Sequence, residues 1–190
     1  MRYFIVIFFL ILLGGCDLFQ TRDAQQPNQS RSNYQVATSP DIVIQNLINS
    51  MKENNLQNYL ACFSDTSFSG KPFLFIPSSG AASLYPSFAS PWDKKNESYY
   101  FTTLIGRPIG DTIRLVITNP NSSQVGDSLI YSASYTLSVP FIDASFPSLY
   151  EGDLKFSMIL DSRLVWSIYL WQDIKSTQYP SWSELKGRLY

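Results

Sequence analysis

Residues 129–139 are Leu-Ile-Tyr-Ser-Ala-Ser-Tyr-Thr-Leu-Ser-Val, a stretch in which apolar side chains alternate with small polar ones. Successive side chains of a β-strand point to opposite faces of a sheet, so this period of two predicts a strand with one buried face. Residues 113–117 and 154–160 alternate in the same way, and a fourth apolar segment, 165–173, follows the tight turn expected at 161–163. These four segments predict antiparallel strands, the first of which should stop at the turn sequence of residues 119–123.

Helical periodicity dominates the part of the chain before these strands. A first helix is expected to begin at Pro40, because Ser39 and Asp41 flank it as an N-cap and a first-turn acid. Apolar residues then recur at helical spacing until the pair Asn54-Asn55, which should end this helix. The remaining predicted elements are a second helix at 56–63, a short aromatic strand at 68–77, and a third helix that opens with a capping box at 90–93 and runs to about 104.

The order helix, helix, strand, helix and then four strands predicts an α+β domain, in which three N-terminal helices pack on the concave face of a curved antiparallel sheet. Residues 40–173 resemble the nuclear transport factor 2-like superfamily in this order, in the segment Tyr59-Leu-Ala-Cys-Phe-Ser-Asp65, and in the closing Trp166-Ser-Ile-Tyr-Leu-Trp171-Gln-Asp173. The resemblance implies a cone-shaped fold, shared by ketosteroid isomerases, dehydratases, polyketide cyclases and many exported proteins. It supplies no catalytic motif.

The amino terminus carries the most specific motif. Arg2 precedes an apolar run at 3–13, which is too short to span a bilayer but has the length of a signal-peptide core. Leu13-Gly14-Gly15-Cys16 then resembles the bacterial lipobox, which implies cleavage before Cys16, diacylglycerol on its sulfur and an added acyl chain such as palmitate. We therefore expect a lipoprotein signal peptide at 1–15, a lipidated Cys16 with a flexible tether at 16–39, and the cone-shaped domain at 40–190.

Composition excludes several classes of function. The 190 residues carry 14 basic and 15 acidic side chains, with no block of either sign, so no nucleic-acid partner is expected. Histidine is absent, which excludes His-dependent nucleophile arrangements and His-containing zinc sites. No spacing of carboxylates or cysteines indicates a metal, and no motif indicates a cofactor.

Two carboxylates are weak candidates for acid or base chemistry. Glu97 lies at helical spacing with Tyr100, Phe101 and Leu104, so the third helix should turn it toward the apolar side. A carboxylate in such a place is either paired with an arginine, an indole or a backbone amide, or has a raised pKa that suits proton transfer. Asp173 ends the last strand, where a carboxylate usually solvates a turn.

Five aromatic residues are candidates for contact with a ligand inside the cone, although packing in the core is the favoured explanation for them. They are Tyr131, Tyr135, Phe156, Trp166 and Trp171.

Three functional hypotheses follow from these observations. The favoured one is a non-catalytic lipoprotein, anchored to a membrane of the bacterial cell envelope with its domain outside the cytoplasm, that binds a small apolar ligand or an envelope protein. The first alternative is an isomerase, dehydratase or hydrolase that uses Glu97 or Asp173. The second is a structural partner in an envelope assembly, for which an exposed apolar patch on the outer face of the sheet would be the mark.

Overall fold

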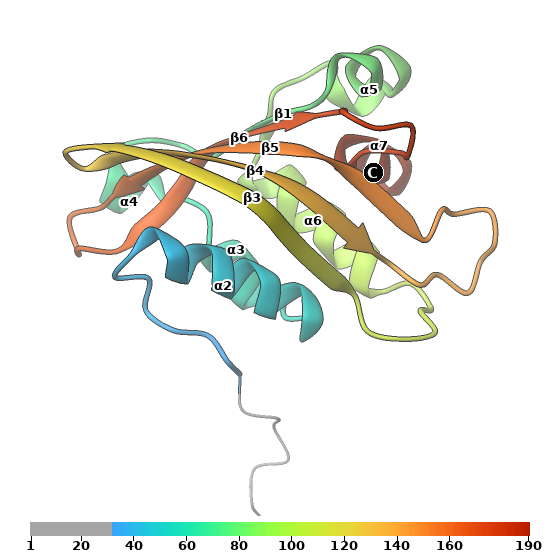
Figure 1. Ribbon diagram of the computed structural model, residues 1–190, viewed down its shortest axis with the longest axis horizontal. Coiled ribbons are helices and arrows are strands. Elements are labelled where there is room, and N and C mark those ends of the chain that lie inside the picture. The colour runs from blue at the N-terminus through green and yellow to red at the C-terminus, as the bar shows by residue number, and fades with distance from the viewer. Residues whose placement is uncertain (1–31) are drawn as a thin grey trace, which may run out of the picture. The chain divides into compact units, whose positions relative to one another are not determined.

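The computed structural model describes residues 32–190, which form one α+β unit from Asn33 to Tyr190. The predicted signal peptide and Cys16 lie outside the described residues. Three helices, α2 (Pro40–Lys52), α3 (Leu56–Ala61) and α6 (Lys94–Ile105), lie on one side of the sheet (Figure 1). The predicted fold class is therefore confirmed.

The sheet has six strands in the order β2-β1-β6-β5-β4-β3, and every neighbouring pair is antiparallel except β1 and β6. The four long strands are β3 (Arg114–Val125), β4 (Ser128–Ser138), β5 (Leu149–Leu160) and β6 (Trp166–Ile174). The two short strands are β1 (Leu74–Ile76) and β2 (Trp92–Asp93).

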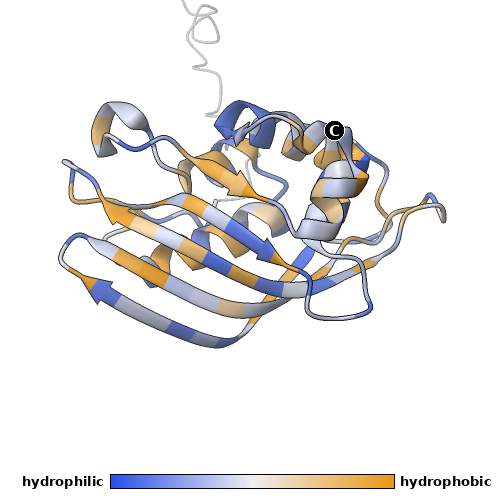
Figure 2. Cartoon of the chain, turned by 90° about the horizontal axis from the view of Figure 1, so that it is seen from above, coloured by the Kyte–Doolittle hydropathy of each residue, from blue (hydrophilic) through white to orange (hydrophobic). Residues whose placement is uncertain are grey.

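Strand β4 shows why the sheet has one covered face. Its inward residues from Leu129 to Leu137 are buried at every second position, and the residues between them are half-buried or exposed. Figure 2 shows this alternation of apolar and hydrophilic residues as bands along the strands. The period of two therefore decides which side of the sheet the helices cover.

The turn predicted at 119–123 is wrong, because β3 continues through it to Val125. The pairing of β3 with β4 shifts between Thr118 and Asn121, so Asn119 and Pro120 form an irregularity in the strand. Asn119 adopts a left-handed conformation with φ of 52°, which asparagine tolerates. The residues that signal a turn thus form a β-bulge within β3. The chain reverses direction only after Val125, where Gly126 has a positive φ of 57°.

Other boundaries also differ from the prediction. The predicted strand 68–77 is reduced to β1, because Asp65 caps a short helix, α4 (Thr66–Ser69), that ends in left-handed Gly70. The third helix starts at Lys94 rather than near residue 90, because the capping box is formed by Asp93 and Asn96 while Trp92 pairs in β2. Two further elements between β1 and β2 were not predicted: α5 (Ser79–Leu84) and a 3₁₀ turn, η2 (Pro86–Phe88).

The last residues of the predicted tether contact the domain. The amide of Asn33 donates to Glu53, the side chain of Asn46 bonds to the backbone of Gln35, and the carbonyl of Ala37 accepts from the amide of Trp166. Ala37 is buried in the core. The packed domain therefore includes the residues just before α2.

A C-terminal helix, α7 (Trp182–Leu189), was missed and completes the core. Trp182, Leu185, Lys186 and Leu189 are buried on one face of it. In Figure 1 it lies beside α6 and the end of the sheet. Among residues 32–190, none of the helices is both long and apolar enough to cross a bilayer.

The close packing of α7 leads to a prediction at Gly187. A Cβ at this position would lie 2.8 Å from Cβ of Tyr85 and closer still to two of its ring atoms. Gly187→Ala should therefore lower the free energy of unfolding by about 1–3 kcal/mol, the usual cost of overpacking. Gly80→Ala is the matched control, because a Cβ there meets nothing within 4 Å and alanine suits a helix better than glycine. Equal midpoints in urea for the two variants would contradict the packing described for α7.

Candidate functional site

Glu97 lies in the first turn of α6, on the face that packs against the core. The Asp93 side chain accepts hydrogen bonds from the amides of Lys95 and Asn96 at 2.8 and 3.1 Å, and this cap fixes where the helix starts. Glu97 then shares the buried face with Tyr100, Phe101 and Leu104 and has no exposed surface. Such a carboxylate must find its hydrogen-bond partners within the protein.

Both oxygens of Glu97 are occupied by donors from other parts of the chain. The Tyr59 hydroxyl donates to Oε1 at 2.6 Å, and Nε1 of Trp92 donates to Oε2 at 2.7 Å. Nζ of Lys186 lies 2.7 Å from Oε1 and 2.6 Å from Oε2. The side chains of Glu97 and Lys186 are both 0% exposed, so they form a buried ion pair. The alternative that Glu97 is held by an indole is borne out, with a lysine and a tyrosine as further partners.

Aromatic rings surround the ammonium group of Lys186. Nζ lies 3.7 Å from the centroid of the Phe75 ring and 3.8 Å from that of Trp171. The rings of Tyr100 and Trp92 follow at 5.2 and 5.7 Å. Cation–π attraction acts over about 6 Å, so all four rings contribute to stabilising the charge.

A second carboxylate, Asp173, holds the start of α7. The Tyr135 hydroxyl donates to Oδ1 of Asp173 at 2.7 Å and accepts from the amide of Trp182 at 2.7 Å. The amide of Ser183 donates to Oδ2 at 2.8 Å, and the Ser183 hydroxyl bonds to the same oxygen. The expectation that Asp173 solvates a turn is wrong, because α7 covers this end of β6 and leaves Asp173 only 3% exposed.

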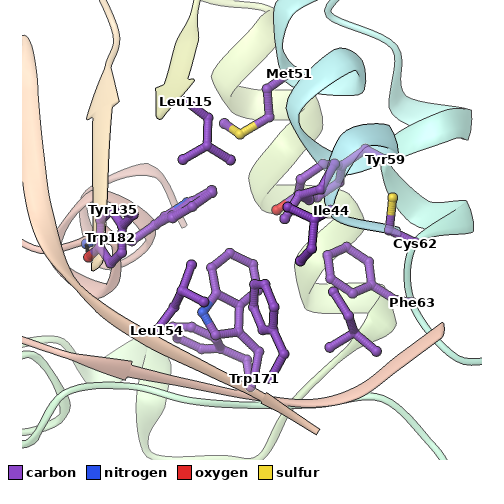
Figure 3. Packing of buried hydrophobic residues seen from close by; sticks show 14 of the residues in the cluster. Ile44, Met51, Tyr59, Cys62, Phe63, Leu115, Tyr135, Leu154, Trp171 and Trp182 are labelled. Atoms are coloured by element: carbon purple, nitrogen blue, oxygen red, sulfur yellow. Dashed lines mark hydrogen bonds between the residues drawn. The ribbon is translucent and has the colours of Figure 1, made fainter. Parts of the chain in front are cut away.

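Tyr100 joins the two carboxylate clusters. Its hydroxyl accepts from Nε1 of Trp182 at 2.8 Å, while its ring faces Lys186. Figure 3 shows Tyr59, Tyr135, Trp171 and Trp182 converging on the interior from four different elements. Side chains of α7 thus occupy the space between the sheet and the other helices.

Comparisons with known proteins identify the fold through structure alone. No family model matches the chain, and no curated protein matches it. A nuclear transport factor 2-like protein from Cytophaga hutchinsonii matches with a TM-score of 0.51 and 12% identity, over 70% of this chain and 93% of that one. A protein of the same superfamily from Salmonella enterica serovar Typhimurium matches with a TM-score of 0.51 and 14% identity, over 72% and 88%. The domain has the nuclear transport factor 2-like fold.

A third match is described as a protein of unknown function with a cystatin-like fold, from Nostoc punctiforme. Its TM-score is 0.51 at 13% identity, and the alignment covers 73% of this chain and 89% of that one. At these identities the comparisons establish the nuclear transport factor 2-like fold and nothing about ligands or reactions.

The five aromatic candidates for ligand contact are all buried within this nuclear transport factor 2-like core. Rings of Tyr131 and Phe156 stack at 6.3 Å, Phe156 meets Trp171 edge-on at 5.4 Å, and Trp171 meets Trp182 edge-on at 4.6 Å. Tyr135 contacts Trp182 in the same way at 5.4 Å, and Trp166 is 4% exposed. Tyr131, Phe156 and Trp171 therefore contact one another and Tyr135 contacts Trp182, while the role of the five residues in ligand binding stays a prediction.

Sequence reasoning missed Lys186 and Trp182, which complete both clusters. The residues Ser181-Trp-Ser-Glu184 match the capping-box pattern, and the structure has both of its hydrogen bonds. This pattern was the available signal for α7. Gly152 leaves room for the Tyr135 hydroxyl that reaches Asp173, because a Cβ there would lie 2.8 Å from it, but this is visible only in the structure.

Pockets on the surface lie outside the Glu97 cluster. An open pocket of about 580 Å³ lies where β1 and β6 end, lined among others by Ile76, Asp173 and Lys175. The carboxylate of Asp173 is already bonded to Tyr135 and Ser183, and Lys175 pairs with Glu184 at 2.9 Å. Within residues 32–190, no group of three or more Cys, Asp or Glu side chains could hold a metal ion.

Burial shifts the pKa of several groups in this core. It raises the pKa of Tyr59, Tyr100 and Tyr135 well above 10, and the charges of Glu97 and Asp173 act in the same direction. Burial lowers the pKa of Lys186 from 10.5 to about 8, against the opposing attraction of Glu97. At neutral pH the lysine is therefore an ammonium ion that donates to both oxygens of Glu97.

The tyrosine shifts predict how stability depends on alkaline pH. Above pH 10 an unfolded chain loses tyrosine protons that Tyr59, Tyr100 and Tyr135 keep in the folded state, so the free energy of unfolding falls as pH rises. Each such tyrosine contributes about 1.4 kcal/mol per pH unit. Tyr59→Phe should therefore make this fall shallower by about that amount in urea titrations between pH 10.5 and 11.5. Tyr179→Phe, at an exposed position, is the control, and identical slopes for all three proteins would contradict the assignment.

Proposed function

We propose that this protein is a lipid-anchored, non-catalytic binding domain of the bacterial cell envelope, and that it recognises another envelope protein with its outer surface. The observation that carries the proposal is that the candidate acid or base groups already have hydrogen-bond partners within the protein. Glu97 and Asp173, the two candidate carboxylates, both accept hydrogen bonds from donors of the chain itself.

The enzyme alternative requires a substrate to reach one of these carboxylates. Glu97 has no exposed surface, and removing Lys186 from it would leave an uncompensated buried charge, which costs about 3–5 kcal/mol. Asp173 is used to hold α7. A general acid or base must come within hydrogen-bond reach of the proton that it transfers. The existing bonds of Glu97 and Asp173 disfavour this role, although Asp173 lines the open pocket at the ends of β1 and β6.

A small apolar ligand inside the domain is also disfavoured. Trp171 and Trp182 lie edge to face at 4.6 Å, and Trp171 also contacts Phe63, Phe75 and Phe156. The aromatic side chains that could line a ligand site thus contact each other. We therefore infer that the protein recognises its partner through its outer surface.

The outer face of the sheet suits a reversible contact with a protein. The outward residues of β4 are all serine or threonine except Ile130, which is flanked across the strands by Ser123 and Ser157. The outer side of β4 is less apolar than a permanent interface, whereas the neighbouring strands also expose Leu74, Ile76 and Val116 on this face. A face of this mixed composition favours a reversible partner over a permanently assembled one.

The anchor part of the proposal rests on the lipobox-like sequence Leu13-Gly14-Gly15-Cys16. Two or three acyl chains hold a protein on a membrane for practical purposes, whereas one does not. The amide of Asn33 donates to Glu53 on the domain, and the 17 residues from Cys16 to this point span at most about 60 Å. A domain on such a tether meets partners close to the membrane surface.

Cys16→Ser tests the anchor. The serine variant cannot accept diacylglycerol, so the protein should leave the membrane fraction, and the mass of the wild-type protein should show cleavage before residue 16 with added lipid. Ser30→Ala, within the predicted tether, should fractionate like the wild type. Unchanged membrane fractionation of Cys16→Ser would contradict lipidation.

A mass measurement tests whether the domain carries a small molecule. The protein purified under non-denaturing conditions should have the mass of the lipidated polypeptide alone, because aromatic side chains fill the interior. A small molecule that co-purifies with the protein in stoichiometric amount would contradict the proposal and support ligand binding inside the domain.

A further inference from the structure

The surroundings of Lys186 have the composition of a binding site for an organic cation. The Nζ atom lies within 3.8 Å of the centroids of the Phe75 and Trp171 rings. On its other side the Glu97 carboxylate accepts two hydrogen bonds from it, at 2.7 and 2.6 Å. Aromatic faces combined with an anion are the means by which proteins bind alkylammonium ions.

The walls of this site come from elements other than the one that fills it. Phe75 lies on β1, Trp92 on β2, Trp171 on β6, and Tyr100 and Glu97 on α6, whereas Lys186 lies on α7. Tyr59 and Trp92 also donate to the two oxygens of Glu97. These bonds position the carboxylate from elements other than α7, as a preorganised cation site requires.

We propose that the aromatic cage of Phe75, Trp92, Tyr100 and Trp171, closed by Glu97, is a binding site for a primary alkylammonium group, which this chain fills with its own Lys186. The two short N–H···O bonds favour a primary ammonium, because a quaternary ammonium has no proton to donate. Shortening Lys186 to alanine removes three methylenes (Cγ, Cδ and Cε) and the ammonium, and leaves room at the carboxylate for an amine of similar length.

Rescue of Lys186→Ala by n-propylammonium tests this site. The variant should melt at least about 6 °C below the wild type, because it leaves Glu97 without its counterion. Propylammonium chloride should raise its melting temperature by at least about 3 °C in a saturable manner, since a ligand that binds only the folded state stabilises it. Potassium chloride, 1-propanol and tetramethylammonium chloride at equal concentration should have a smaller effect.

Three control proteins separate the site from general effects of the amine. Lys175→Ala removes the part-exposed ammonium that pairs with Glu184, so propylammonium should not shift its melting temperature beyond the salt control. The wild type should not respond either, because Lys186 already occupies the cage. Lys186→Ala combined with Glu97→Gln should lose the response, because the anion is gone.

Folding of the variant does not limit the test. If Lys186→Ala does not fold in buffer, its refolding yield with propylammonium becomes the measurement, and an amine-dependent yield supports the site. No amine-specific effect on either the melting temperature or the refolding yield would overturn the proposal. Equal effects on Lys175→Ala or on the Glu97→Gln double variant would overturn it as well.

Discussion

The buried ion pair between Glu97 and Lys186 is the constraint on which the rest of the interior depends. Moving two charges out of water costs several kcal/mol per ion, and the attraction between them offsets this cost only when the remaining hydrogen-bonding positions are also filled. Here Tyr59 and Trp92 fill them on the carboxylate, and aromatic rings surround the ammonium. Six elements of the chain, α3, β1, β2, α6, β6 and α7, must therefore be in place together, so the pair specifies one arrangement of the helices.

The same constraint explains why this domain differs from an open cone. The fold places helices over the concave face of a sheet, and the space between them can either remain accessible or be filled. In this chain Trp182 and Lys186 project into it from α7. Glu97 binds Lys186, Tyr100 accepts from the Trp182 indole, and Asp173 accepts from the neighbouring Ser183 amide. The residues that first suggest catalysis thus hold the C-terminal helix.

The parts of the fold that could be predicted are those that repeat a pattern over many residues. The alternation in β4 and the helical spacing around Leu47 and Met51 follow directly from which face is buried. Glu97 could be predicted to point inward for the same reason. Its partner could not, because Lys186 is 89 residues away in sequence and a lysine is rarely buried without a charge to meet. The end of β3 was misjudged because Asn119-Pro120 favours a turn locally, whereas pairing with β4 on both sides of it stabilises a bulge.

That bulge has a consequence for how the protein behaves among its own copies. Strand β3 is the outermost strand of the sheet, with twelve residues and one long side that pairs with no other strand in the described chain. An exposed edge strand of this kind can template the addition of strands from other molecules and so start fibrillar aggregation. Pro120 offers no amide proton, and the irregular backbone around it interrupts the row of donors and acceptors that an incoming strand would need. The bulge therefore protects the protein from edge-to-edge aggregation through β3 at high concentration.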